Sequence, residues 1–124
     1  MKTMIKGLLL TFLLSSFLFG NSQVKPLSSQ SKICLLTVGP GNDLYSIFGH
    51  TAIRVKDPEQ NFDLAFNYGT FAFSDDFYFQ FTMGKLNYRL SIEPYDRFVA
   101  GYQYENRWVR EQVLNLDSTQ KQQV

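Results

Sequence analysis

The sequence predicts one α+β domain, in which an antiparallel sheet is flanked by helices. Apolar and polar residues alternate over residues 50–55 and 62–68, and turn-forming residues separate the two stretches, which is typical of a β-hairpin. Apolar residues recur at helical spacing after Pro94. The chain has 124 residues, of which 44% are hydrophobic, and this amount suffices for a single core.

The start of the chain has the composition of a secretory signal. Two lysines precede an apolar run that is shorter than a membrane-spanning helix needs, and small residues follow it. We therefore expect a signal peptide over residues 1–22, a flexible lead-in over residues 23–31 and a folded domain over residues 32–124. Export is expected, with a retained anchor as the alternative to cleavage.

Charge and cysteine content exclude several classes of function. The formal net charge is +1, becomes −1 when the two lysines of the signal are lost, and forms no basic stripe, so we expect no nucleic-acid partner. The chain has one cysteine, Cys34, and therefore no internal disulfide. One cysteine and one histidine do not make a structural zinc site, and we expect neither a metal nor a cofactor.

The first structural element is an apolar run over residues 32–38, which predicts a central strand with Cys34 inside it. A Gly-Pro-Gly sequence over residues 39–41 ends this strand. Asp43 is placed to cap a short helical turn, and Gly49 is a typical residue for its end.

The predicted hairpin places the only histidine, His50, at the first position of a strand. The alternating side chains expected to face the core are Thr51, Ile53 and Val55. Those expected on the opposite face are His50, Ala52 and Arg54. Matching apolar positions across the hairpin predicts the pairs Val55–Phe62, Ile53–Leu64, Thr51–Phe66, Arg54–Asp63, Ala52–Ala65 and His50–Asn67.

This register makes His50 a candidate general base. Directly opposed residues lie roughly 4.5–5.5 Å apart at Cβ, so Asn67 is expected to hydrogen-bond one imidazole nitrogen and leave the other for chemistry. The alternative is that His50 is a structural histidine at the end of a strand.

The next segment predicts a helix and a strand. Ser74 is a candidate N-cap, Asp75 and Asp76 suit the first turn of the helix, Gly84 suits its end, and residues 85–92 alternate as a strand does. The segment is rich in aromatic residues, which we interpret as core packing, with an acyl-chain groove as the alternative. These residues are Phe71, Phe73, Phe77, Tyr78, Phe79 and Phe81.

The last third of the chain predicts a helix that begins with Pro94 at its first position. Its apolar face comprises Tyr95, Phe98, Val99 and Tyr102. Residues 108–116 are expected to form a strand, and Asp117 with Gln120 resembles a capping box. The short helix that this box begins suggests an incomplete domain.

Four spaced motifs occur in order along the chain. They are Leu36-Thr37-x-x-Pro40-Gly41-x-x-Leu44-Tyr45-Ser46-x-Phe48-Gly49-His50-Thr51-Ala52-Ile53-Arg54-Val55, then Asn67-Tyr68-Gly69-Thr70-Phe71, then Gly84-Lys85-Leu86-x-Tyr88, and last Tyr104-Glu105-x-Arg107 with Gln112-Val113-Leu114-Asn115-Leu116. Together they resemble the Lnb N-terminal periplasmic domain family of Gram-negative bacteria, over nearly all of the chain after the signal.

This resemblance implies part of a permuted papain-like fold, similar in arrangement to NlpC-type peptidases and lecithin:retinol acyltransferase. It implies a membrane-associated thiol acyltransferase in the periplasm or at the periplasmic face of the inner membrane, with phospholipid and lipoprotein substrates. An acyl chain passes from phospholipid to an enzyme cysteine and then to the terminal amine of a lipoprotein. His50 matches the family's catalytic histidine, whereas the downstream Asn-Cys motif of the family has no counterpart here.

Two other functions remain open. One is a non-catalytic envelope or lipid-binding module, or a remnant of the enzyme, and the other is a papain-like amide or peptide hydrolase on the same scaffold. Cys34 is not expected to be the nucleophile. It lies in an apolar strand that disfavours the thiolate, and it precedes His50, whereas the resemblance implies a later cysteine.

Overall fold

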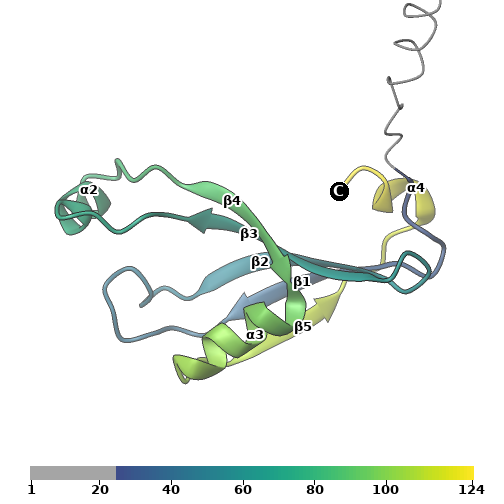
Figure 1. Ribbon diagram of the computed structural model, residues 1–124, viewed down its shortest axis with the longest axis horizontal. Coiled ribbons are helices and arrows are strands. Elements are labelled where there is room, and N and C mark those ends of the chain that lie inside the picture. Colours follow the sequence, from purple (N-terminus) through teal and green to yellow (C-terminus); the bar gives the residue numbers. More distant parts are fainter. Residues whose placement is uncertain (1–24) are drawn as a thin grey trace, which may run out of the picture.

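The computed structural model describes residues 25–124, and the predicted signal peptide over residues 1–22 lies outside this range. The described chain forms a five-stranded antiparallel sheet in the order β4-β3-β2-β1-β5 with three helices (Figure 1), which confirms the predicted α+β class. The elements are β1 (Lys32–Val38), β2 (His50–Asp57), β3 (Phe62–Thr70), α2 (Phe77–Thr82), β4 (Arg89–Pro94), α3 (Tyr95–Tyr104), β5 (Val109–Val113) and α4 (Ser118–Lys121).

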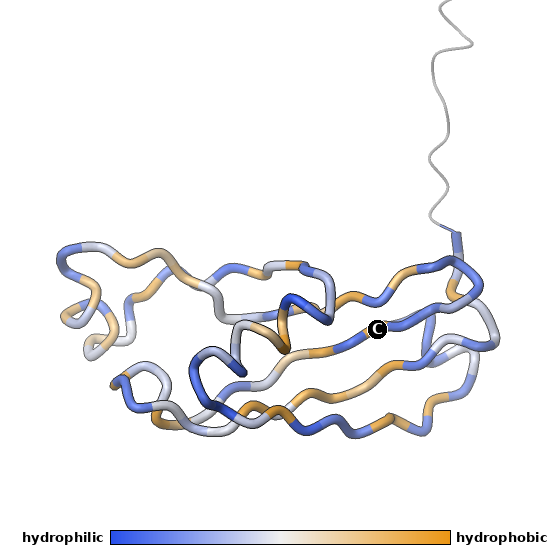
Figure 2. Tube along the Cα trace, turned by 60° about the horizontal axis from the view of Figure 1, so that its bottom comes forward, coloured by the Kyte–Doolittle hydropathy of each residue, from blue (hydrophilic) through white to orange (hydrophobic). Residues whose placement is uncertain are grey.

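The three helices occupy different places around the sheet (Figure 1). α3 lies against one face of the sheet. α2 lies at the tip of the segment over residues 71–88, which continues from β3 and returns into β4 and which we call the arm. The loop between β1 and β2 lies at the same end of the molecule as this arm, and α4 lies at the opposite end. Hydrophobic stretches run along the strands and continue into the arm (Figure 2), so the arm is apolar although it projects from the sheet.

The predicted hairpin exists, but its register was wrong by two residues. Val55 pairs with Leu64 rather than with Phe62, and Ile53 pairs with Phe66. The reason is the turn, because β2 runs on to Asp57, whose carboxylate accepts the backbone N–H groups of the turn at 3.0 and 3.2 Å. A shift of two keeps every side chain on its predicted face.

The face predicted to form the core was also wrong. Ala52 of β2 and Ala65 of β3 are buried with Leu36, Val38 and Phe98, and Phe98 comes from α3. The main core therefore lies on the face that carries His50. The small alanines leave room for a helix to approach the sheet closely, whereas the bulkier side chains predicted as core lie on the other face.

The apolar stripe predicted for α3 is confirmed, because Tyr95, Val99 and Tyr102 pack against this core together with Phe98. Pro94 is the last residue of β4 and precedes the helix as its N-cap, rather than occupying the first helical position. The strand predicted over residues 85–92 begins later, at Arg89.

Two predicted caps differ from the structure, and one is confirmed. Asp76, not Ser74, occupies the N-cap position of α2, and the Ser74 hydroxyl bonds the Asp76 carboxylate at 2.6 Å. The Asp43 carboxylate accepts the Tyr45 hydroxyl at 3.1 Å instead of capping a helix. Asp117 and Gln120 form the predicted capping box at the start of α4.

The described part of the lead-in is hydrogen-bonded to the sheet. The backbone N–H and the hydroxyl of Ser28 donate to the Asp57 carboxylate at 2.7 and 2.6 Å. Burial of Asp57 favours the neutral acid, but these bonds and those from Gln60 outweigh it and hold the pKa well below its usual range. This carboxylate therefore joins the lead-in to the β2–β3 turn.

Packing under α3 gives a first testable prediction. Ala65→Leu adds three carbon atoms where Phe98 meets the sheet, so it should lower the free energy of unfolding by about 1–3 kcal/mol. Ala100→Leu makes the same change at an exposed position of α3 and should alter stability by less than about 0.5 kcal/mol. Urea unfolding of both variants tests this, and equal losses would contradict the proposed packing.

Candidate active site

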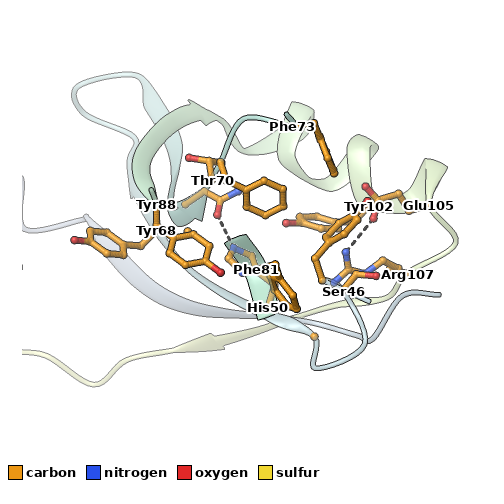
Figure 3. A pocket seen from close by; sticks show the side chains of 15 residues that line it. Ser46, His50, Tyr68, Thr70, Phe73, Phe81, Tyr88, Tyr102, Glu105 and Arg107 are labelled. Atoms are coloured by element: carbon orange, nitrogen blue, oxygen red, sulfur yellow. Dashed lines mark hydrogen bonds and ion pairs between the residues drawn. The ribbon is translucent and has the colours of Figure 1, made fainter. Parts of the chain in front are cut away.

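His50 lines a cavity of about 320 Å³ between the start of β2, the end of β3, the arm and α3 (Figure 3). We call this cavity the His50 pocket. Its wall is aromatic toward the arm and charged toward the end of α3. The aromatic residues are Tyr45, Tyr68, Phe71, Phe73, Phe81 and Tyr88, with Tyr102 of α3, and the charged ones are Glu105 and Arg107.

Two glycines with positive φ shape the backbone beside His50. Gly49 has a φ of +74°, and a Cβ there would lie 2.7 Å from the Val38 carbonyl oxygen, so the tight entry into β2 requires glycine. Gly69 has a φ of +117° and lies where the β3–β4 pairing shifts between Tyr68 and Thr70. This irregularity lies beside the imidazole, since a Cβ at Gly69 would be 3.6 Å from His50 Cε1, an ordinary contact distance. It is the positive φ that favours glycine at residue 69.

The structure brings the two predicted site residues together. The distance between His50 Nε2 and Asn67 Oδ1 is 2.5 Å, and Asn67 is buried. The contact is diagonal across the two strands rather than between directly opposed residues, because of the two-residue change in register. An amide oxygen only accepts hydrogen bonds, so Nε2 carries the proton and Nδ1 is left as the basic nitrogen.

The aromatic wall of the pocket belongs to the arm and to the loop before His50. Tyr45 packs edge to face against Phe71, Phe73 and Phe77, with ring centroids 5.3–5.7 Å apart. The prediction that this segment forms core holds only for Phe77, which is buried, since Phe73 is 65% exposed. The remaining rings surround the pocket or face solvent, because the arm projects from the sheet and no other element of residues 25–124 covers it.

The opposite wall contains a buried arginine. Arg107 Nε donates to the Gly39 carbonyl oxygen at 2.8 Å, and Nη1 pairs with Glu105 at 2.9 Å. Its guanidinium lies 4.8 Å from the ring centre of Tyr102, which in turn faces His50. Among the described residues, Nη2 of Arg107 has no hydrogen-bond partner.

Reasoning from the sequence did not assign Tyr102, Glu105 and Arg107 to the site. Tyr102 has the helical spacing of a core residue, and it does pack on Phe98 with ring centroids 4.9 Å apart. Glu105 and Arg107 occur together in a motif, which was the only signal for them.

Cys34 is far from His50 and chemically unsuited to partner it. Val38 pairs with His50, and Cys34 precedes it by four residues on the same strand, a separation of about 13 Å. Burial, with a contribution from the hydrogen bond to Glu111, raises the pKa of the thiol from 9.0 to about 11. Cys34 lies instead beside a structural ion-pair cluster.

That cluster centres on Arg54. Its guanidinium bonds the Asp63 carboxylate at 2.7 and 2.5 Å, bonds Glu111 of β5, and lies 3.5 Å above the ring centre of Tyr95. Arg54 was predicted opposite Asp63, and the pair forms diagonally. These contacts join β2, β3, β5 and α3 away from the His50 pocket.

Two further properties concern residues 25–124. In this range, no three side chains from His, Cys, Asp and Glu converge as a metal site would require. No helix there has the length and hydrophobicity needed to cross a bilayer.

Comparison with known proteins supports the resemblance seen in the sequence. The family model described as the Lnb N-terminal periplasmic domain matches residues 23–124, so the resemblance is confirmed. Searches of curated proteins and of solved structures found no match.

The environment of Cys34 gives a second prediction. A pKa of about 11 leaves about one hundredth of the thiolate that a cysteine with a pKa of 9.0 has near pH 8, so Cys34 should react with iodoacetamide at least about 100-fold more slowly in the folded chain than in urea. As a control, Cys34→Ser combined with Thr37→Cys moves the thiol to an exposed position of β1 and should react rapidly. Rapid labelling of the unmodified folded chain would show that Cys34 is reactive.

Proposed function

The chain belongs to the Lnb N-terminal periplasmic domain family, and from this premise we propose that the His50 pocket is the histidine-bearing half of a periplasmic thiol acyltransferase. The observation that carries the proposal is the hydrogen bond between His50 Nε2 and Asn67 Oδ1 at the pocket. It leaves a basic Nδ1 beside a cavity. A papain-like permuted arrangement is part of this proposal.

The proposed reaction is N-acylation of a lipoprotein, with phospholipid as acyl donor. His50 Nδ1 takes the proton of a thiol, and the thiolate attacks the ester carbonyl carbon. The carbon–oxygen bond breaks, and the protonated imidazole returns the proton to the departing alcohol. The lipoprotein amine then attacks the thioester, loses a proton to His50, and the thiol leaves with that proton.

The division of the pocket supports an acyl substrate. The aromatic wall of Phe71, Phe73 and Phe81 offers apolar surface for an acyl chain, and the charged wall at Glu105 and Arg107 offers partners for polar groups. His50 lies in the same cavity, as the reacting carbonyl requires. The lipid and lipoprotein substrates, and a position at the inner membrane, belong to the same proposal.

The thiol must come from outside these 124 residues. Cys34 is the only cysteine in the sequence, and its distance from His50 and its raised pKa make it unfit. The family resemblance implies a cysteine that follows the histidine in the chain, so the proposed enzyme needs a segment that supplies it.

The proposal is tested in a chimera in which residues 23–124 replace the matching segment of a cysteine-bearing family member. His50→Ala should lower the rate of lipoprotein N-acylation by about 10²–10⁴-fold, because it removes the general base. Cys34→Ser should leave the rate within about twofold. The rate is measured by mass spectrometry of the lipoprotein's N-terminal peptide.

Three results would each contradict a different part of this proposal: the base, the source of the thiol, or acyl transfer itself. An active His50→Ala chimera would exclude His50 as the base, and an inactive Cys34→Ser chimera that still folds would restore Cys34 as the nucleophile. Release of free fatty acid without acylation of the amine would identify a hydrolase on the same scaffold.

A non-catalytic lipid-binding module is the second candidate, and the exposed aromatic side chains beside the pocket favour it. In that case the 124-residue chain itself should bind dihexanoylphosphatidylcholine, and Phe73→Ser should weaken binding several-fold because Phe73 lines the pocket. Phe79→Ser, at an exposed position that does not line the pocket, should leave the affinity unchanged. Titration followed by NMR measures both, and binding without turnover in the chimera would favour this candidate over the enzyme.

A further inference from the structure

The face of the sheet opposite α3 carries an apolar groove of about 860 Å³, which we call the sheet groove. Its floor consists of bulky side chains that point away from the core under α3, because side chains alternate along β2 and β3. The volume lies within the range of small-molecule sites, roughly 300–1,000 Å³. The apolar side chains of the three strands that line the groove are Ile53, Val55, Phe62, Leu64, Phe66 and Leu90.

The sheet groove follows β3 over most of its length. Phe62 lies at the start of this strand, and Tyr68, near its end, lines both the sheet groove and the His50 pocket. The six residue steps between Phe62 and Tyr68 span about 20 Å. The acyl chains of one membrane leaflet fill about 15 Å, half of the hydrocarbon core. The groove is therefore long enough for one extended acyl chain.

The end of the sheet groove away from the His50 pocket is built by the lead-in and α4, which lies at the end of the molecule opposite the arm (Figure 1). The Gln122 side-chain amide accepts the Leu27 backbone N–H at 2.9 Å and donates to the Leu27 carbonyl oxygen at 3.0 Å. Lys121 Nζ donates to the Ser31 carbonyl oxygen at 2.7 Å. These bonds hold two segments of the chain together, so this end of the groove has a defined shape.

The same end carries positive charge that has no carboxylate partner. Lys25 and Lys121 line the groove, and neither forms an ion pair with another of residues 25–124. An ammonium group has three N–H donors, so Lys121 keeps two after it bonds Ser31. The single acidic group among the lining residues is the α-carboxylate of Val124, which leaves the groove with a net positive charge. An apolar groove with a positive end complements a ligand that has a long apolar chain and an anionic head.

We propose that the sheet groove binds a long-chain fatty acid, with its carboxylate at Lys25 and Lys121 and its hydrocarbon chain along β3 toward Tyr68. The carboxylate accepts charge-assisted hydrogen bonds from the two ammonium groups. The hydrocarbon chain covers apolar side chains that otherwise contact water. This site does not rest on the proposed function, because neither His50 nor a thiol takes part in it.

The first test compares two ligands that have the same hydrocarbon chain and opposite charge. Dodecanoate and dodecyltrimethylammonium are titrated into the ¹⁵N-labelled 124-residue chain below their critical micelle concentrations. Dodecanoate should shift the amide signals of β2 and β3 and bind at least about tenfold more tightly, since a cationic head meets the lysines as a like charge. Equal affinities would overturn the assignment of an anionic ligand.

The second test measures the direction in which the ligand lies. A stearate with a nitroxide near its carboxylate should broaden the amide signals of Lys121 and Gln122, and a stearate with a nitroxide near its methyl end should broaden those of Tyr68 and Leu90. The reverse pattern would overturn the proposed orientation. Broadening confined to residues of the His50 pocket, such as His50, would show that the fatty acid binds there instead and would overturn the proposal. A groove covered by a second copy of the chain, which is a further way to overturn it, would give amide shifts that depend on protein concentration without ligand.

Charge variants test the positive end. Lys121→Gln should weaken dodecanoate binding by about tenfold, because it removes one charged donor. Lys25→Gln makes the same change at an exposed lysine and should also weaken binding, and it covers the case in which Lys121→Gln does not fold. Lys85→Gln, at an exposed lysine of the arm, is the matched control and should leave the affinity within about twofold. Equal affinities in all three variants would refute the proposed site for the carboxylate.

A pair of apolar variants tests the floor of the groove. Leu90→Asn changes a side chain that lines the groove and is 51% exposed, so it should weaken dodecanoate binding several-fold without unfolding the chain. Val113→Asn makes a similar change on β5, outside the groove, at a side chain that is 58% exposed, and should leave the affinity unchanged. Equal effects would contradict binding along β3. An inactive chimera would leave all of these titrations unaffected, so failure of the proposed function is distinguishable from failure of this inference.

Discussion

The packing of α3 against Ala52 and Ala65 is the contact on which the rest of the structure depends. Two methyl side chains on neighbouring strands leave space for Phe98, and the helix is thereby held close to the sheet. One helical turn after Phe98 comes Tyr102, which this packing brings to His50. The position of the helix and the composition of the pocket are thus one consequence of small residues in β2 and β3.

Polar networks then hold the two ends of the sheet in different ways. At the turn end, the buried Asp57 joins the lead-in at Ser28 to the hairpin. In the middle, Arg54 connects Asp63 with Glu111, and so connects strands far apart in the sequence. At the pocket end the backbone is less regular, with glycines at positive φ beside His50. The regularly paired part of the sheet thus supports the end of the sheet where the strands and their side chains surround the His50 pocket.

The site has some of the parts of a thiol enzyme. It contains an oriented imidazole, an aromatic wall and a buried arginine. The chain's one thiol, in contrast, lies beside the Arg54 cluster, where burial raises its pKa. This division is consistent with the proposed function, because a reactive thiol requires a cationic or solvated surrounding that β1 does not provide. The lipid-binding alternative uses the same aromatic surface. It differs from the proposed enzyme because it needs no thiol beside His50.

The sequence by itself determined the element types, the strands of the hairpin and the shared face of His50 and Asn67. Period-two and period-3.6 patterns are local properties, and a register error of two leaves the faces unchanged. Only the tertiary structure decided which face is buried, because bulky Ile53 and Phe66 suggested one side and the space beside Ala52 and Ala65 admitted α3 on the other. It also decided that Tyr102 belongs to the site, because the helical spacing of a core residue does not show that the same ring also lines the His50 pocket.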